Sequence, residues 1–224
     1  MDLLMTAAVP FPLGLRERPF PILGPDGLVD ITDGINQAVL PDLNIRVADE
    51  KIPSGSMHLE PQIYKEGVVF DQNGVTVTAI EVDHGDLVKP AFAFRVDYQG
   101  RTFVHSHDTR FCQNLVDQAA GADLFIHEVA AANPEALAMS PKIQRIIGHH
   151  ITPDLLGHVF RDVSPKLAVL THIIRYPPDP PSLGEIVAQV CATYGGELEI
   201  TRDLMRFHIG EQVEIVDPGI VVPI

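Results

Sequence analysis

Positive charge is scarce in this chain of 224 residues, which has 16 Lys and Arg against 30 Asp and Glu and a formal net charge of −14. Nonspecific binding to nucleic acid or to an anionic membrane needs basic surface that displaces counterions. The charge balance therefore disfavours both kinds of partner. Long apolar runs are missing too, and a membrane span takes roughly 18 consecutive apolar residues. We expect no membrane segment.

Cysteine is nearly absent, because Cys112 and Cys191 are the only two in the chain. They offer neither a disulfide framework nor a paired-thiolate zinc site. Each lies in an expected helix, where we interpret it as a buried free thiol. The first eight residues also lack the basic start and the cleavage site of a signal peptide. The cytoplasm is therefore the expected location.

Hydrophobic residues make up 46% of the chain, enough for a substantial core in one domain. Residues 1–63 differ from the rest, because their many prolines break helices and central strands. Within them we expect a short strand at Phe20–Leu23 and a helix at Val29–Val39. We predict that the segment as a whole is irregular and wraps on the remainder.

From residue 67 onward, strands come first and then alternate with helices. The expected strands span residues 68–70, 75–82, 92–98, 102–105, 123–126, 167–170, 197–200 and 212–216. The expected helices span residues 111–120, 134–147, 153–161 and 183–193. This order predicts an α/β fold, a sheet layered with helices.

Metal-capable side chains follow three of the apolar strands, namely His84, Asp108 and His172. Ligands at strand ends are common in α/β active sites. A carboxylate such as Asp108 can bridge two divalent metals because its oxygens point in different directions. It can equally cap the helix that starts near Phe111. Taken alone, either histidine is also an ordinary loop residue.

Two further motifs carry an imidazole or a carboxylate. His127-Glu128 closes another buried strand, and a carboxylate there would orient a nearby histidine, although a surface pair is the alternative. His149-His150 precedes a helix capped by Thr152. Near a helix N-terminus, an imidazole would have a depressed pKa and could donate to a leaving-group oxygen. The histidines without a supporting pattern, interpreted as structural or exposed, are His58, His158 and His208.

The order of these motifs is more specific than any one of them. The motifs occupy residues 77–84, 104–110, 124–128, 150–152 and 170–172. In this order they resemble the second half of a metallo-β-lactamase-fold hydrolase of the ribonuclease Z and arylsulfatase-like branch. The resemblance implies an αββα sandwich that is N-terminally incomplete. Residues 1–224 would then form a single metallo-β-lactamase-like domain, the C-terminal two-thirds of the full fold.

The resemblance also assigns roles to individual residues. His84 and His172 would each ligate one of two zinc ions, with Asp108 bridging them, and other divalent metals are alternatives. His150 would be the general acid or electrophilic stabiliser, and Glu128 would orient it. The implied chemistry is attack by a metal-bridging hydroxide on a phosphate or related ester.

The family's zinc signature, His-x-His-x-Asp-His, is missing from the chain, although it should lie just before a stretch like Asp2–Thr6. A truncated gene model, a fragment and a decayed homologue are all open explanations. Each metal would keep one histidine and the shared Asp108, whereas about four protein ligands usually hold a zinc tightly. We therefore expect weak or no stoichiometric zinc binding by this chain alone. An apolar sheet edge should also be exposed, which favours aggregation or pairing as a homodimer.

Two other departures concern the substrate. The family's Ser-Gly-Asp-Thr reads Ser106-His107-Asp108-Thr109 here, and we interpret His107 as pointing to solvent, with a compensating ligand as the alternative. Ribonuclease Z enzymes that process transfer RNA carry a long arm between the matches to His84 and Asp108. A hairpin through Gln99-Gly100 takes its place here. With the acidic charge, this favours a smaller ester over transfer RNA, and Lys89-Pro90 resembles the arylsulfatase-like branch.

The main hypothesis is a metal-dependent hydrolase of phosphate or related esters, in a truncated form whose dinuclear zinc site is incomplete. One alternative is a non-catalytic homologue that acts as a binding or oligomerisation module. Another is a mononuclear site of His84, Asp108 and His172, with His105 or His107 as a further ligand.

Overall fold

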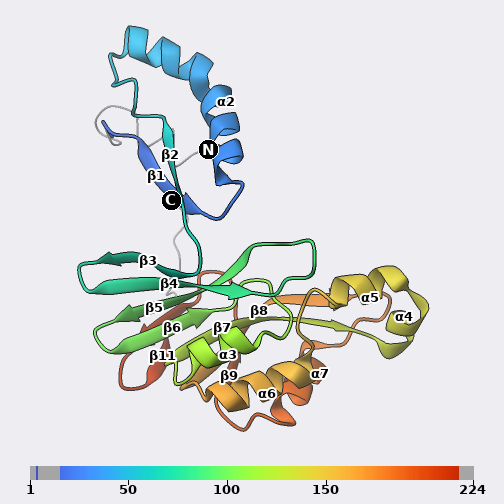
Figure 1. The fold of residues 1–224 in the computed structure, drawn as a ribbon. Helices are drawn as coiled ribbons and strands as arrows, with labels where there is room; N and C mark the ends of the chain where they lie inside the picture. Colours follow the sequence, from blue (N-terminus) through green and yellow to red (C-terminus); the bar gives the residue numbers. More distant parts are fainter. Residues whose placement is uncertain (1–3, 5–15, 217–224) are drawn as a thin grey trace. The chain divides into compact units, whose positions relative to one another are not determined.

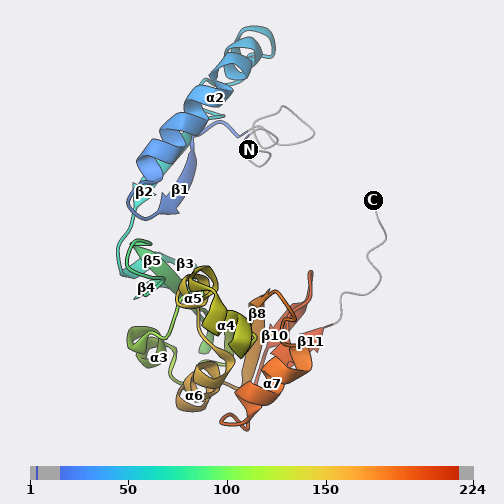
Figure 2. The same cartoon turned by 90° about the vertical axis from the view of Figure 1, so that its right-hand side faces the viewer.

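The computed structural model describes residue 4 and residues 16–216, which fall into two compact units, residues 1–65 and 66–224. Figures 1 and 2 show their elements. Each unit is described by itself. That the whole chain is a single domain stays a prediction.

The first unit is a small β-α-β arrangement. Strand β1 (Phe20–Gly24) pairs in parallel with β2 (Leu59–Ile63), and helix α2 (Leu28–Asp49) connects them. The predicted strand and helix are confirmed. The prediction of an irregular segment is wrong for this stretch, because apolar side chains at helical spacing, among them Val39, pack on Met57. Pro41 lies inside the helix with its side chain exposed, so its ring displaces none of these contacts.

The second unit is built on a seven-stranded sheet in the order β3-β4-β5-β6-β7-β8-β9. Its strands are β3 (Gly67–Gln72), β4 (Val75–Val82), β5 (Ala91–Tyr98), β6 (Arg101–His105), β7 (Leu124–Ala132), β8 (Leu167–Tyr176) and β9 (Leu198–Ile200). Pairing is antiparallel from β3 to β6 and parallel from β6 to β9. The two predicted hairpins are confirmed, and their turns place Asn73 and Gln99 at positive φ, each followed by a glycine.

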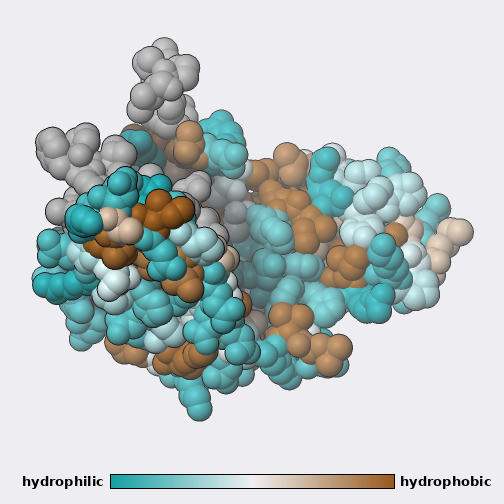
Figure 3. Space-filling model, turned by 90° about the horizontal axis from the view of Figure 1, so that it is seen from above, coloured by the Kyte–Doolittle hydropathy of each residue, from teal (hydrophilic) through white to brown (hydrophobic). Residues whose placement is uncertain are grey.

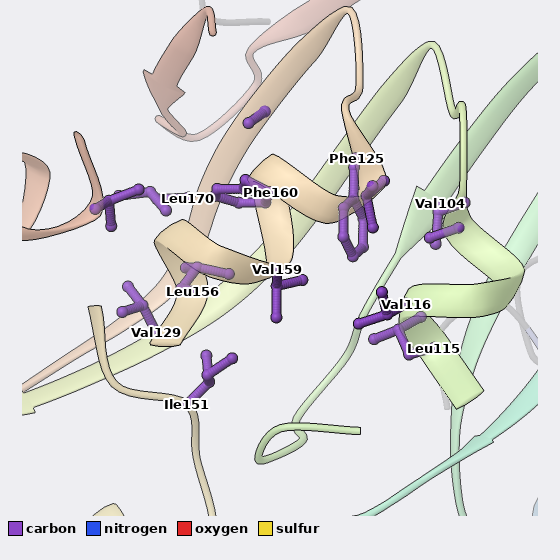
Figure 4. Close-up of a cluster of buried hydrophobic side chains, with 14 of the residues drawn as sticks. Val104, Leu115, Val116, Phe125, Val129, Ile151, Leu156, Val159, Phe160 and Leu170 are labelled. Carbon is purple, nitrogen blue, oxygen red and sulfur yellow. The ribbon is translucent and has the colours of Figure 1, made fainter. Parts of the chain in front are cut away.

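Helices α3 (Gln113–Ala119), α6 (Pro153–Val163) and α7 (Leu183–Cys191) cover one face of this sheet. Helices α4 (Pro134–Met139) and α5 (Pro141–Ile147) form a separate cluster with Ala130 and Ile174, near the ends of β7 and β8. Phe125 and Leu170 from the sheet meet Leu156 and Phe160 of α6 in the main core, shown in Figure 4. The predicted α/β architecture is thus confirmed.

Local chemistry corrects two helix predictions. The helix expected over residues 134–147 is two helices, because Ser140 is extended and caps the second one, with Pro141 at its first position. The prediction of buried thiols is wrong for Cys191, which is exposed at the end of α7, and Cys112 is half-buried just before α3. None of the described helices is long and apolar enough to cross a membrane.

The opposite face of the sheet carries a thinner cover, the hairpin of β10 (Arg206–Ile209) and β11 (Val213–Val216). A hollow of about 750 Å³ lies there, lined by Phe103, Ile126 and Phe207 among others. At the sheet edge, Val68 and Phe70 of β3 are 63% and 40% exposed, which agrees with the expected apolar edge. Figure 3 shows hydrophobic patches between hydrophilic ones on the surface seen from above.

Candidate active site

The three predicted metal ligands converge in the structure. His84 lies in the loop after β4, Asp108 in the loop after β6, and His172 within β8. The Nε2 atom of His84 is 3.9 Å from Oδ2 of Asp108, and the Nε2 atom of His172 is 3.5 Å from its Oδ1. Asp108 therefore presents a different carboxylate oxygen to each imidazole.

His172 reaches this position through a β-bulge. Glu128 of β7 pairs with Thr171 of β8, and the next pair is Val129 with Ile173, so His172 has no partner in the ladder. Its φ of 42° is in the left-handed region, uncommon for a non-glycine residue and often found at functional sites. The expectation that His172 follows the end of its strand is wrong, because β8 resumes its pairing beyond the bulge.

Asp108 does not cap a helix, which removes the alternative reading of this residue. Helix α3 begins at Gln113, and its N-cap position is occupied by Cys112. The loop of Asp108 is instead fastened to the loop of His84, because the backbone N–H of Arg110 donates to the carbonyl of Asp83 at 2.8 Å. The Arg110 guanidinium lies 2.9 Å from the Asp83 carboxylate, and it lowers the pKa of that carboxyl.

His150 and Glu128 form a hydrogen-bonded pair beside these ligands. The Nδ1 of His150 lies 3.1 Å from Oε2 of Glu128, whose Oε1 accepts from the backbone N–H of Ile151 at 3.0 Å. The His150 ring lies 5.2 Å from that of His84 and 5.8 Å from that of His172, measured between centroids. His150 thus stands between the two predicted metal-binding imidazoles.

The electrostatics of this pair correct the expected pKa. Full burial raises the pKa of Glu128, and its hydrogen bonds offset this only in part. For His150, burial alone would lower the pKa, but the hydrogen bond and charge of Glu128 and the charge of Asp108 outweigh it. The pKa of His150 is therefore raised, and the expected depression near a helix N-terminus is wrong.

The remaining histidines of the motifs have different surroundings. His127 is buried beside the rings of Phe125 and Phe160, and burial lowers its pKa to about 4. Neither His127 nor Glu128 closes its strand, since β7 continues to Ala132. His105 and His107 pack against each other, with ring centroids 4.5 Å apart. His107 is exposed, as predicted.

Residues 14–173 of the chain match the beta-lactamase superfamily domain. The chain belongs to the beta-lactamase superfamily. This chain is 26% identical over 196 residues to "Ribonuclease Z" of Mycobacterium avium (strain 104), a match that covers 85% of this chain and 68% of that protein. The predicted ribonuclease Z-like character is thus confirmed.

Solved structures agree with this superfamily fold. The metallo-beta-lactamase fold protein YhfI from Bacillus subtilis matches with a TM-score of 0.58 at 15% identity, over 85% of this chain and 64% of YhfI. Zn²⁺-bound PqqB from Methylobacterium extorquens matches with a TM-score of 0.52 at 14% identity, over 83% of this chain and 61% of PqqB. The chain spans less than two thirds of either solved protein. The metallo-β-lactamase fold is confirmed by these matches.

Members of the superfamily typically bind metals, so the fit of this chain's donors to zinc matters. Two ligands of one tetrahedral zinc lie roughly 3.3 Å apart, and the distances from Asp108 to the two imidazoles, 3.9 and 3.5 Å, come close to this. Yet no group of three or more His, Cys, Asp or Glu among the described residues is arranged to hold a metal. Each zinc would have one imidazole and one carboxylate oxygen, fewer than the three protein ligands usual in a catalytic zinc site. The donors of the described residues do not complete a zinc centre by themselves.

Sequence reasoning found His84, Asp108, Glu128, His150 and His172, which the structure brings together. It missed His149, whose ring contacts the loop of His84. The one available signal was its position next to His150, and adjacency in the chain does not say where a ring points.

Proposed function

We propose that this chain carries the site of a metal-dependent hydrolase of phosphate or related esters. The observation that supports this most is the convergence of His84 and His172 on the two oxygens of Asp108, beside the His150–Glu128 pair. Zinc held there would activate water and polarise the ester. Membership of the beta-lactamase superfamily supports the same reaction class.

The chain's own residues divide the work between them. His84, Asp108 and His172 would bind metal, with Asp108 shared. Glu128 holds the Nδ1 side of His150 at 3.1 Å, which leaves Nε2 of that imidazole to face a substrate. His150 would donate a proton to the leaving-group oxygen or stabilise its charge, with Glu128 as its orienting partner.

The substrate we propose is a small ester rather than transfer RNA. Between His84 and Asp108 the structure has a short loop and the β5–β6 hairpin, with no inserted arm. The net charge of −14 also opposes a polyanionic partner. Rates on bis(p-nitrophenyl) phosphate and on an aryl sulfate, compared in the presence of zinc, would separate a phosphodiesterase from an arylsulfatase-like activity.

Substitutions test the assignment in the same assay. Asp108→Ala and His150→Gln should each remove most of any zinc-dependent hydrolysis, while His208→Ala, far along the chain on β10, should leave the rate unchanged. Equal rates for all variants would contradict the proposed site.

The incomplete donor set leads to a second part of the proposal. We propose that further metal ligands come from outside the described residues, in a longer parent protein. Reading the DNA upstream of Met1 tests this directly, because an in-frame His-x-His-x-Asp-His would supply the ligands. A stop codon close upstream would contradict it.

The alternative function is a non-catalytic binding or oligomerisation module, favoured by the count of two donors per metal. It predicts a purified protein without zinc by elemental analysis and without phosphodiesterase activity. Zinc-dependent turnover that Asp108→Ala abolishes would exclude this alternative.

A further inference from the structure

The imidazole rings of His84 and His149 each form a hydrogen bond with the backbone carbonyl of the other residue. The Nδ1 of His84 lies 2.9 Å from the carbonyl oxygen of His149, and the Nδ1 of His149 lies 2.7 Å from the carbonyl oxygen of His84. A carbonyl oxygen only accepts hydrogen bonds, so each Nδ1 must carry the proton that it donates. In a neutral His84 ring, Nε2 therefore keeps its lone pair, and this atom faces Asp108 at 3.9 Å.

The ring of His149 packs directly against Gly85. A Cβ atom added at Gly85 would lie 2.3 Å from Nδ1 and 2.5 Å from Cε1 of His149, closer than real Cβ atoms approach other atoms. Gly85 also has a φ of +103°, which side-chain-bearing residues rarely adopt. Glycine is thus required at this position for two independent reasons, namely the close approach of the His149 ring and the positive φ.

This contact joins two segments far apart in the chain. One is the loop after β4 that carries His84, and the other is the connection between α5 and α6 that carries His150. The residue next to His149 therefore belongs to the His150–Glu128 pair. A shift of the His149 ring would disturb both sides of the site at once.

We propose that His149 is a positioning residue. Its ring, packed on Gly85 and donating to the carbonyl of His84, holds the carbonyl of His149 where it accepts from Nδ1 of His84, and this fixes His84 in the Nδ1–H tautomer with Nε2 directed at Asp108. Partners of this kind commonly set the tautomer of a metal-binding histidine. The part of the proposal that concerns metal rests on the proposed function. The tautomer does not, and it can be measured on the metal-free protein.

Long-range ¹H–¹⁵N NMR of the imidazoles reads the tautomer, with His84→Gln used to assign the His84 signals. We expect the Nδ1–H pattern in the wild type and a mixture of tautomers in His149→Ala. His149→Asn should restore the wild-type pattern, because its amide nitrogen occupies the place of Nδ1 and donates to the same carbonyl. If the alanine variant fails to fold, His149→Gln replaces it, since its amide lies one carbon too far. His208→Ala is the control.

A zinc titration with Zn²⁺ alone, followed by the same signals, gives the second measurement. Loss of such a partner typically lowers metal affinity about 10-fold or more, so His149→Ala should bind more weakly than His149→Asn by that factor. An Nε2–H tautomer in the wild type, or an unchanged His84 pattern in His149→Ala, would overturn the proposal. If no variant binds zinc while the tautomer follows residue 149, the positioning role stands and zinc binding by this chain alone is excluded.

Discussion

The two faces of the seven-stranded sheet are built differently. Phe125 of β7 points to the helix-covered face and is completely buried, whereas Phe103 of the neighbouring β6 lies half-buried on the face with the hollow. Helices pack several large side chains against each strand residue, and a two-stranded hairpin covers fewer of them. We infer that the helix-covered face contributes most of the unit's stability, while apolar side chains on the other face stay partly exposed.

The largest expected effect comes from truncating the buried ring. Phe125→Ala should lower the free energy of unfolding by about 3–5 kcal/mol, because a cavity is left between the sheet and α6. The matched variant Phe103→Ala should cost about 1–2 kcal/mol, since that ring is already half in solvent. Urea denaturation followed by circular dichroism measures both. Equal losses would remove the difference between the faces.

A smaller effect is expected at Glu128, a buried residue of strand β7 whose side chain makes hydrogen bonds. Glu128→Ala removes the acceptor of His150 and of the Ile151 N–H in a buried place. The unfolding free energy should fall by about 1–3 kcal/mol. Glu128→Gln keeps an acceptor of the same shape and should lose less. The order of these two variants in thermal melting decides whether hydrogen bonding or volume matters there.

The residue just before β7 gives a pH-dependent prediction. Burial would raise the pKa of Asp123, but the ion pair with Lys166 and the hydrogen bond from Thr102 lower it below its ordinary value. A carboxyl with a lowered folded-state pKa adds stability above its unfolded pKa and loses it as the pH falls through the folded pKa. Asp123→Asn should lower the free energy of unfolding by about 1 kcal/mol or less at neutral pH. The difference should vanish at a pH low enough to protonate Asp123 in the wild type. Denaturation at several pH values from 7 downward tests this, and a pH-independent difference would contradict it.

The smallest effect on stability is expected at the edge strand. Val68→Lys should change the unfolding free energy by no more than about 0.5 kcal/mol, because the side chain is mostly exposed. It should nevertheless weaken self-association, since lysine on an edge strand opposes pairing with a second strand. Sedimentation at increasing concentration measures this, with Gln118→Lys on the exposed side of α3 as a charge-matched control. Identical sedimentation of wild type and Val68→Lys would argue against pairing through β3.

Much of the second unit follows from local sequence. Alternating apolar residues and the Asn73-Gly74 turn identify the hairpins, and the motif order identifies the site. The bulge at His172 could not be predicted, because it depends on how β8 pairs with β7 rather than on β8 itself. The direction of the His150 pKa shift likewise depends on Glu128, a residue 22 positions away in the chain.

The bulge has a consequence for how the site can change. Before it, Ala168 and Leu170 pack on the helix-covered core, and after it Ile173 does, so one inserted residue shifts the alternation of the strand. Substituting His172 would remove a ligand and leave that shift in place. Deleting the residue would instead remove the bulge, so that Thr171 and Ile173 pair in regular succession with Glu128 and Val129 and the later side chains keep their faces. For this strand, the gain or loss of the metal ligand is therefore tied to chain length as well as to side-chain identity.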